Sequence, residues 1–64
     1  MISIEEASKN ILSILNPYEI KGLSYYYDSQ RLSLRLRRNI SIEKIEEIYL
    51  FADRHNLKLD ILFE

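Results

Sequence analysis

The clearest pattern in this chain is the strict alternation of arginine or serine with leucine from Arg31 to Arg37. Successive side chains of a β-strand point to opposite faces of the sheet, so a period of two separates the leucines from the polar residues. Leucine requires a core, whereas arginine requires water or an anion. The segment therefore predicts a strand with one buried and one open face. The inward set is Leu32, Leu34 and Leu36, and the outward set is Arg31, Ser33, Arg35 and Arg37.

Two segments have the spacing of amphipathic helices. The first covers residues 4–15, and Ser3 three residues before Glu6 fits a capping box at its start. Asn16-Pro17 ends it, because the residue before a proline is pushed out of the α region. The second helix covers residues 42–55 and ends at Asn56. The expected inward stripes are Ile4, Ala7, Ile11, Ile14 and Leu15 on the first helix, and Ile42, Ile45, Ile48, Tyr49 and Ala52 on the second.

Two further segments predict strands on either side of this pattern. Residues 22–27 are rich in tyrosine, and a turn of two or four residues around Asp28-Ser29 joins them to the leucine strand. Both turn lengths place Tyr26 opposite Arg31. Residues 57–63 alternate again. The side chains expected to point inward are Leu23, Tyr25, Tyr27, Leu57, Leu59, Ile61 and Phe63, and Tyr26 and Leu62 are expected to point outward.

This order of elements predicts a single α+β domain that covers residues 1–64. It is a two-layer α-β-β-α-β sandwich, in which a three-stranded sheet carries both helices packed on one face. The connection through the second helix should be a right-handed crossover. The third strand can lie antiparallel beside the first or parallel beside the second, and the sequence leaves both orders open. A domain this small buries about 60% of its unfolded surface, so association is a natural source of further stability.

The element order is similar to that of three small folds: the bacterial BON-type domain, the cytoplasmic tail domain of cation-efflux transporters and the prokaryotic K homology domain. The resemblance is one of topology and covers the whole chain. The glycine-rich clamp loop of K homology domains has no counterpart, because Gly22 is the only glycine. The histidines of the efflux tail domains have no counterparts at the matching positions. Topology alone implies a fold and no function.

Composition and motifs argue against catalysis and against metal or cofactor binding. The chain has no cysteine, and His55, its one histidine, is expected to interact with the dipole at a helix end rather than with a metal. It contains no nucleophile elbow and no phosphate loop. We therefore expect no enzymatic activity, catalytic residue, metal, cofactor or small-molecule substrate. The first residues lack the features of a signal peptide, and no apolar run approaches the ~20 residues that span a bilayer, so we expect a cytoplasmic protein without membrane contact.

Several large apolar side chains miss the inward stripes and therefore suggest a contact surface. Leu50 and Phe51 are expected to point away from the core of the second helix, and Leu12 is displaced in the same way on the first. A wide stripe or a bent helix end would bury them instead. The preferred interpretation is a small interaction module, regulatory in character, that forms a homodimer or docks on a partner protein. Its partner-binding residues would be Leu12, Leu50, Phe51, Tyr26 and Leu62.

The arginines of the open sheet face offer a second interpretation. Arg31, Arg35 and Arg37 are interleaved with Tyr26, which resembles a thin stacking platform for single-stranded nucleic acid. A net charge of −1 and the nearby Asp60 oppose it, and an ordinary solvated strand face gives the same pattern. As an anion-binding set, the arginines would orient an acidic protein partner or contact phosphates. Weak single-stranded nucleic-acid binding is the alternative function.

Overall fold

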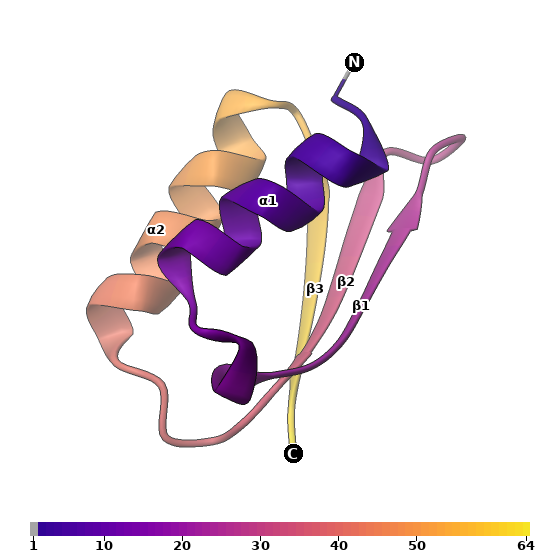
Figure 1. Cartoon of the computed structure of the whole chain (residues 1–64). Helices are drawn as coiled ribbons and strands as arrows, with labels where there is room; N and C mark the ends of the chain where they lie inside the picture. The colour runs from indigo at the N-terminus through magenta and orange to yellow at the C-terminus, as the bar shows by residue number, and fades with distance from the viewer. Residues whose placement is uncertain (1) are drawn as a thin grey trace.

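The computed structural model, which describes residues 2–64, has two helices and a three-stranded mixed sheet. This confirms the predicted α+β sandwich (Figure 1). The elements follow in the order α1 (Ile4–Ile14), a 3₁₀ turn η1 (Pro17–Glu19), β1 (Ile20–Tyr26), β2 (Arg31–Leu36), α2 (Ile42–Arg54) and β3 (Lys58–Phe63).

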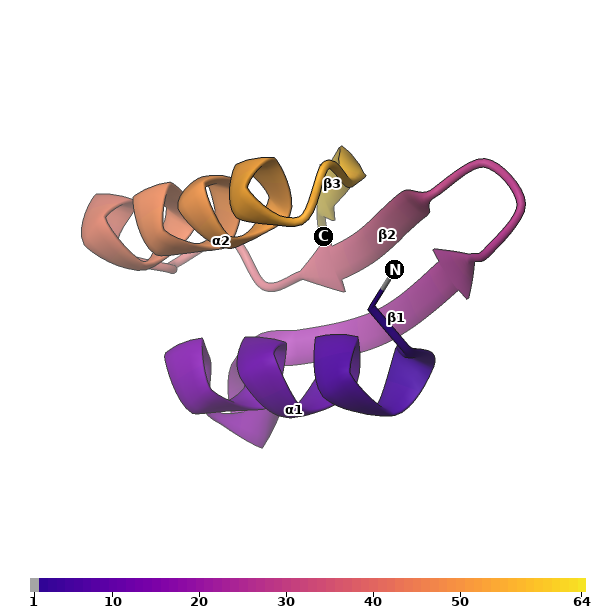
Figure 2. The same cartoon turned by 90° about the horizontal axis from the view of Figure 1, so that it is seen from above.

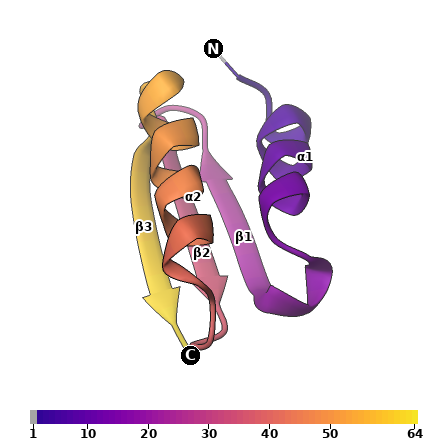
Figure 3. The same cartoon turned by 90° about the vertical axis from the view of Figure 1, so that its left-hand side faces the viewer.

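The sheet has the order β1-β2-β3, with β1 antiparallel and β3 parallel to the central strand β2. Of the two strand orders that the sequence leaves open, the structure therefore has the one with β3 beside β2. The crossover from β2 through α2 to β3 is right-handed, as Figure 3 shows from the helix side. Consequently β1 and β3 are the two edge strands, and nothing in the described residues lies beyond the outer edge of β3.

Both helices cover the same face of the sheet, and the core lies between the two layers. Seen from above in Figure 2, α1 runs alongside β1 and α2 lies toward β3. The alternation of β2 is confirmed, because its three leucines are buried and its polar residues are not. The buried core consists of Ile2, Ala7, Ile11, Leu15, Leu32, Leu34, Leu36, Ile48, Phe51, Ala52 and Leu57.

The hairpin has the predicted register, with Tyr26 opposite Arg31 and Tyr25 opposite Leu32. A four-residue turn of residues 27–30 closes it, and Gln30 adopts a left-handed φ of 53°. The expectation that Tyr27 points inward is wrong, because the strand ends at Tyr26 and Tyr27 belongs to the turn. Its ring still lies 5.4 Å from that of Tyr25, measured between centroids.

Polar side chains fix the ends of the helices. The Oγ atom of Ser3 accepts a hydrogen bond from the backbone N–H of Glu6 at 3.1 Å, as expected for an N-cap. A full capping box forms instead at η1, where Asn16 and Glu19 exchange two bonds of 3.1 Å each. The sequence pattern ends the first helix correctly near Pro17, but it does not anticipate that this proline opens a 3₁₀ turn.

Candidate functional site

The outer edge of β3 is an unpaired row of backbone groups. The N–H of Lys58 donates to Gln30 at 2.7 Å and that of Glu64 donates to Leu36 at 2.8 Å, so both amides point toward β2. Backbone direction alternates along a strand, and residues 58, 60, 62 and 64 therefore use their polar groups inside the sheet. The N–H and C=O groups of residues 59, 61 and 63 point outward from the edge. Such an edge is a template for pairing with another strand.

An apolar hollow lies directly beside this edge, between α2 and β3. It has a volume of about 540 Å³. Tyr49 and Leu50, at its rim, are 53% and 61% exposed, and Phe63 at the end of β3 is 43% exposed. Exposed apolar side chains that adjoin one another mark interaction sites more often than scattered ones do. The hollow is lined by Glu46, Tyr49, Leu50, Ala52, Asp53, Leu57 and Leu59.

The apolar stripe of α2 is rotated relative to the sequence prediction. Phe51, expected to point outward, is only 4% exposed and belongs to the core, whereas Tyr49 and Ile42, expected to point inward, are exposed. The reason is the position of the neighbours. Helix α1 packs on the flank of α2 that carries Phe51, and on the opposite flank the sheet ends at β3, so nothing covers Tyr49. The prediction that Phe63 is a core residue is wrong for the same reason, since Phe63 ends an edge strand.

The two helical leucines proposed as partner contacts are both exposed, but they lie on different flanks. Leu12 lines a shallow hollow with Ile4 on the outside of α1, whereas Leu50 lines the hollows on either side of α2. None of these three hollows contains both leucines. Leu50 therefore belongs to the surface beside β3, and Leu12 stands apart from it.

The open face of the sheet carries the other predicted residues. Tyr26 and Leu62 are exposed there, as expected, and both line a depression of about 440 Å³ whose floor includes small residues of β1 and β2. The side chain of Arg35 lies across Gly22. A Cβ atom at Gly22 would come within 3.2 Å of the Nε atom of Arg35, so the one glycine of the chain makes room for this arginine.

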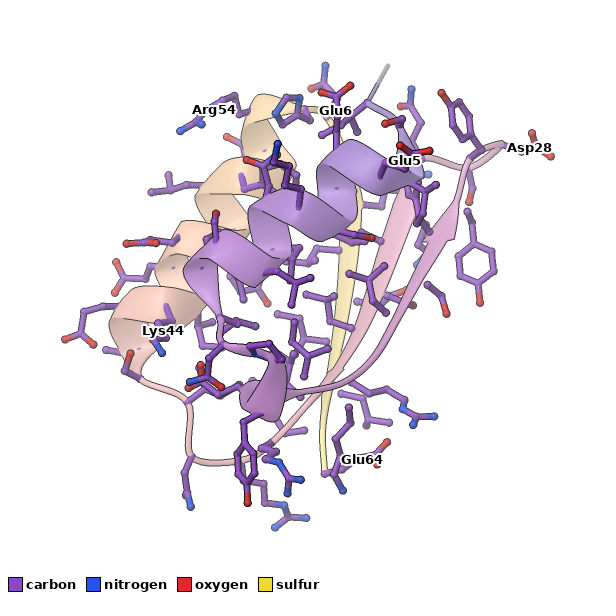
Figure 4. All side chains as sticks on the ribbon, viewed as in Figure 1. Glu5, Glu6, Asp28, Lys44, Arg54 and Glu64 are labelled. Atoms are coloured by element: carbon purple, nitrogen blue, oxygen red, sulfur yellow. The ribbon has the colours of Figure 1, made fainter. Side chains whose placement is uncertain are left out.

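The arginines on this face are already paired with carboxylates of the same chain. The Nη1 atom of Arg31 lies 2.6 Å from Asp60, and the Nε atom of Arg35 lies 3.3 Å from Glu64. Lys21 also approaches Glu64, at 3.8 Å. Figure 4 shows Glu64 at the end of the sheet opposite to the hairpin tip. An incoming phosphate would have to replace these carboxylates, which lowers the suitability of the face for nucleic acid.

Arg37 does not continue the row of Arg31 and Arg35, because β2 ends at Leu36. Its Nε atom donates to the backbone oxygen of Tyr18 at 2.7 Å, and its guanidinium lies 4.7 Å from the centre of the Tyr18 ring. The backbone N–H of Arg37 also donates to Glu19 at 3.0 Å. Arg37 thus ties the end of β2 to η1, and it is not part of a continuous anion-binding surface with the other two arginines.

The one titration shift in the described residues serves the fold rather than a reactive site. Glu19 accepts a hydrogen bond from the Nζ atom of Lys44 at 2.8 Å and another from the backbone of Asn16. These bonds, the one from Lys44 foremost, lower the pKa of Glu19 below its ordinary value of 4.5. The pair links η1 to the first turn of α2.

Within residues 2–64, no group of three or more His, Cys, Asp or Glu side chains is arranged to hold a metal ion. No helix in this part of the chain is long and apolar enough to cross a bilayer. His55 forms the C-cap of α2 with its ring 4.9 Å from that of Phe51. Comparison of the chain with protein-family models, curated proteins and solved structures finds no match.

The sequence pattern does not predict that the residues beside β3 form one surface. The parts of this surface are visible in the sequence, since residues 57–63 alternate and α2 has more large apolar residues than one stripe can hold. The missing information is the strand order. Only once β3 is known to be an edge strand does the flank with Tyr49 become an uncovered one.

Proposed function

We propose that this chain is a non-enzymatic interaction module that binds a protein partner through its β3 edge surface. This surface consists of the outward backbone groups of residues 59, 61 and 63 together with the apolar hollow beside them. The observation that carries the proposal is the coincidence of the two: an unpaired strand edge runs alongside a hollow lined by exposed Tyr49 and Leu50. The cytoplasmic location expected from the sequence stays part of this proposal.

Strand addition at such an edge combines two sources of affinity. Backbone hydrogen bonds satisfy the outward N–H and C=O groups, and apolar side chains of the partner fill the hollow. The other surfaces supply less. The arginines of the open face are bound to carboxylates, and Leu12 lies on a flank of its own. The β1 edge is interrupted by an irregularity between Ile20 and Gly22, and a bulge of this kind hinders strand pairing.

The test is photo-crosslinking in an extract of the cells that make the protein. A photoreactive phenylalanine analogue replaces Tyr49 in one variant and Tyr18, which is exposed on η1, in the control. We expect a defined adduct from position 49, either to another protein or to a second copy of the chain, and none from position 18. Equal crosslinking at the two positions, or no adduct from position 49, would refute the proposal.

A further inference from the structure

We infer that the partner of the β3 edge surface is a second copy of this chain, which pairs β3 with β3 in antiparallel orientation about a two-fold axis at Ile61. This inference rests on the function proposed above and names its occupant. The result is a continuous six-stranded sheet with four helices on one face. Self-pairing of identical edges is a common solution, because a two-fold axis makes the same patch complementary to itself.

Backbone direction restricts the possible registers. The outward N–H and C=O groups belong to residues 59, 61 and 63, because the amides of Lys58 and Glu64 point toward β2. In an antiparallel pair, hydrogen bonds join residues that both point across the gap. Only pairs drawn from Leu59, Ile61 and Phe63 can therefore form the new ladder, and the axis must pass through one of these residues or midway between two of them.

Ladder length and charge together select among these registers. An axis at Leu59 or at Phe63 joins only one outward residue of β3 to its own equivalent, whereas an axis at Ile61 uses all three. An axis at Ile61 places Lys58 opposite Glu64 of the second copy, which is an attractive pair. An axis midway between Leu59 and Ile61 places Asp60 opposite its own equivalent, and an axis midway between Ile61 and Phe63 places Asp60 opposite Glu64. Like charges directly opposite each other destabilise a sheet. Lys58 forms no ion pair among the described residues of its own chain, so its charge is available for this contact. Glu64 already holds Arg35 and Lys21 of its own chain, so Lys58 of the second copy would share that carboxylate with them.

The same register matches the apolar residues. It places Leu59 opposite Phe63 of the second copy and Ile61 opposite its own equivalent, all on the helix side of the sheet. Leu59 lines the hollow beside α2, and the half-exposed ring of Phe63 is the apolar group that the second copy would bring to it. The pairing therefore covers both features that the isolated chain leaves open.

The experiment removes one outward amide hydrogen and no side chain. The 64-residue chain is made by chemical synthesis with N-methyl-Ile61, and N-methyl-Ile4 is the matched control, because the N–H at the first position of a helix has no partner within that helix. Light scattering from about 10 µM to about 1 mM measures the mass. We expect dimers of the unmodified chain and of the N-methyl-Ile4 chain, and a monomer for N-methyl-Ile61. A monomeric unmodified chain, or a dimer with N-methyl-Ile61, would overturn the inference.

A charge exchange tests the register without touching the backbone. Lys58→Glu should weaken dimerisation by about tenfold, since two symmetric contacts become repulsive. The double variant Lys58→Glu with Glu64→Lys should recover part of this loss, because Glu64→Lys also removes the ion pairs of Glu64 with Arg35 and Lys21. Asp60→Asn should leave dimerisation unchanged, and tighter association would indicate the register in which Asp60 faces itself. An adduct from position 49 to a different protein, with a monomer in light scattering, would contradict the inference and leave the proposed module intact.

Discussion

Phe51 and its neighbour Leu50 distinguish the orientation of α2 in the structure from the orientation that the sequence suggests. The two residues are adjacent in the chain, yet the structure buries Phe51 between the helices and leaves Leu50 61% exposed. Phe51→Ala and Leu50→Ala therefore remove side chains of comparable size from opposite environments. Comparison of the two free energies of unfolding reports which flank of the helix faces the core.

The structure sets the expected size of each effect. Truncation of a fully buried phenylalanine to alanine costs about 3–5 kcal/mol, because the transfer free energy is lost and a cavity remains. A surface substitution changes stability by about 0.5 kcal/mol or less. A domain of this length has a total stability of roughly 3–10 kcal/mol, so Phe51→Ala removes a large part of it. Ile48→Val, at the centre of the stripe, provides a graded variant with a cost of about 0.5–1.5 kcal/mol.

The assay is urea unfolding followed by circular dichroism at the lowest usable protein concentration, so that association contributes little. With a slope of about 1 kcal/mol per molar urea, Phe51→Ala should shift the midpoint by several molar or abolish folding, and Leu50→Ala should leave it almost unchanged. Equal shifts for the two variants, or a larger one for Leu50→Ala, would refute the placement of α2. If Phe51→Ala does not fold, Ile48→Val must still destabilise more than Leu50→Ala.

Three further predictions concern single contacts. Ser41→Ala should cost about 1 kcal/mol in chemical denaturation, because the hydroxyl of Ser41 caps α2 at the N–H of Lys44; an unchanged midpoint would contradict this. Glu19 has a lowered pKa in the folded state, so its contribution to folding stability is present at neutral pH and is lost as the pH falls through that lowered value. The difference in Tm between wild type and Glu19→Gln should therefore shrink below about pH 4.5, and a difference that grows there would contradict this. Fluorescence anisotropy of labelled oligothymidylate should stay unchanged even at low salt, since Arg31 and Arg35 already hold carboxylates, and salt-sensitive binding would revive the nucleic-acid interpretation.

Local patterns in the sequence were sufficient for the elements and for the hairpin. The alternation in β2 defines which side chains are buried, and the register with β1 follows from it, because a shift by one residue would expose every leucine. The capping position of Ser3 and the left-handed conformation of Asn56 were also readable, since both depend on neighbours within a few residues.

Features that depend on how the helices and strands are arranged could not be predicted from the sequence. The spacing of apolar residues in α2 allows two stripes, one centred on Ile45 and one on Ile48, and only the positions of α1 and β3 decide between them. The ion pairs of Arg31 and Arg35 likewise join segments far apart in the chain, so alternation alone suggested free arginines. The candidate site likewise depends on the strand order, because it exists only when β3 is an edge strand.

Amide hydrogen exchange by NMR at two protein concentrations tests the role of the β3 edge most directly. The N–H of Ile61, which has no partner within its own sheet, should exchange quickly in dilute solution and become protected at high concentration. The amides of Lys58 and Glu64, bonded to the neighbouring strand, should be protected at both concentrations. Rapid exchange of the Ile61 amide at every concentration would show that the β3 edge does not pair.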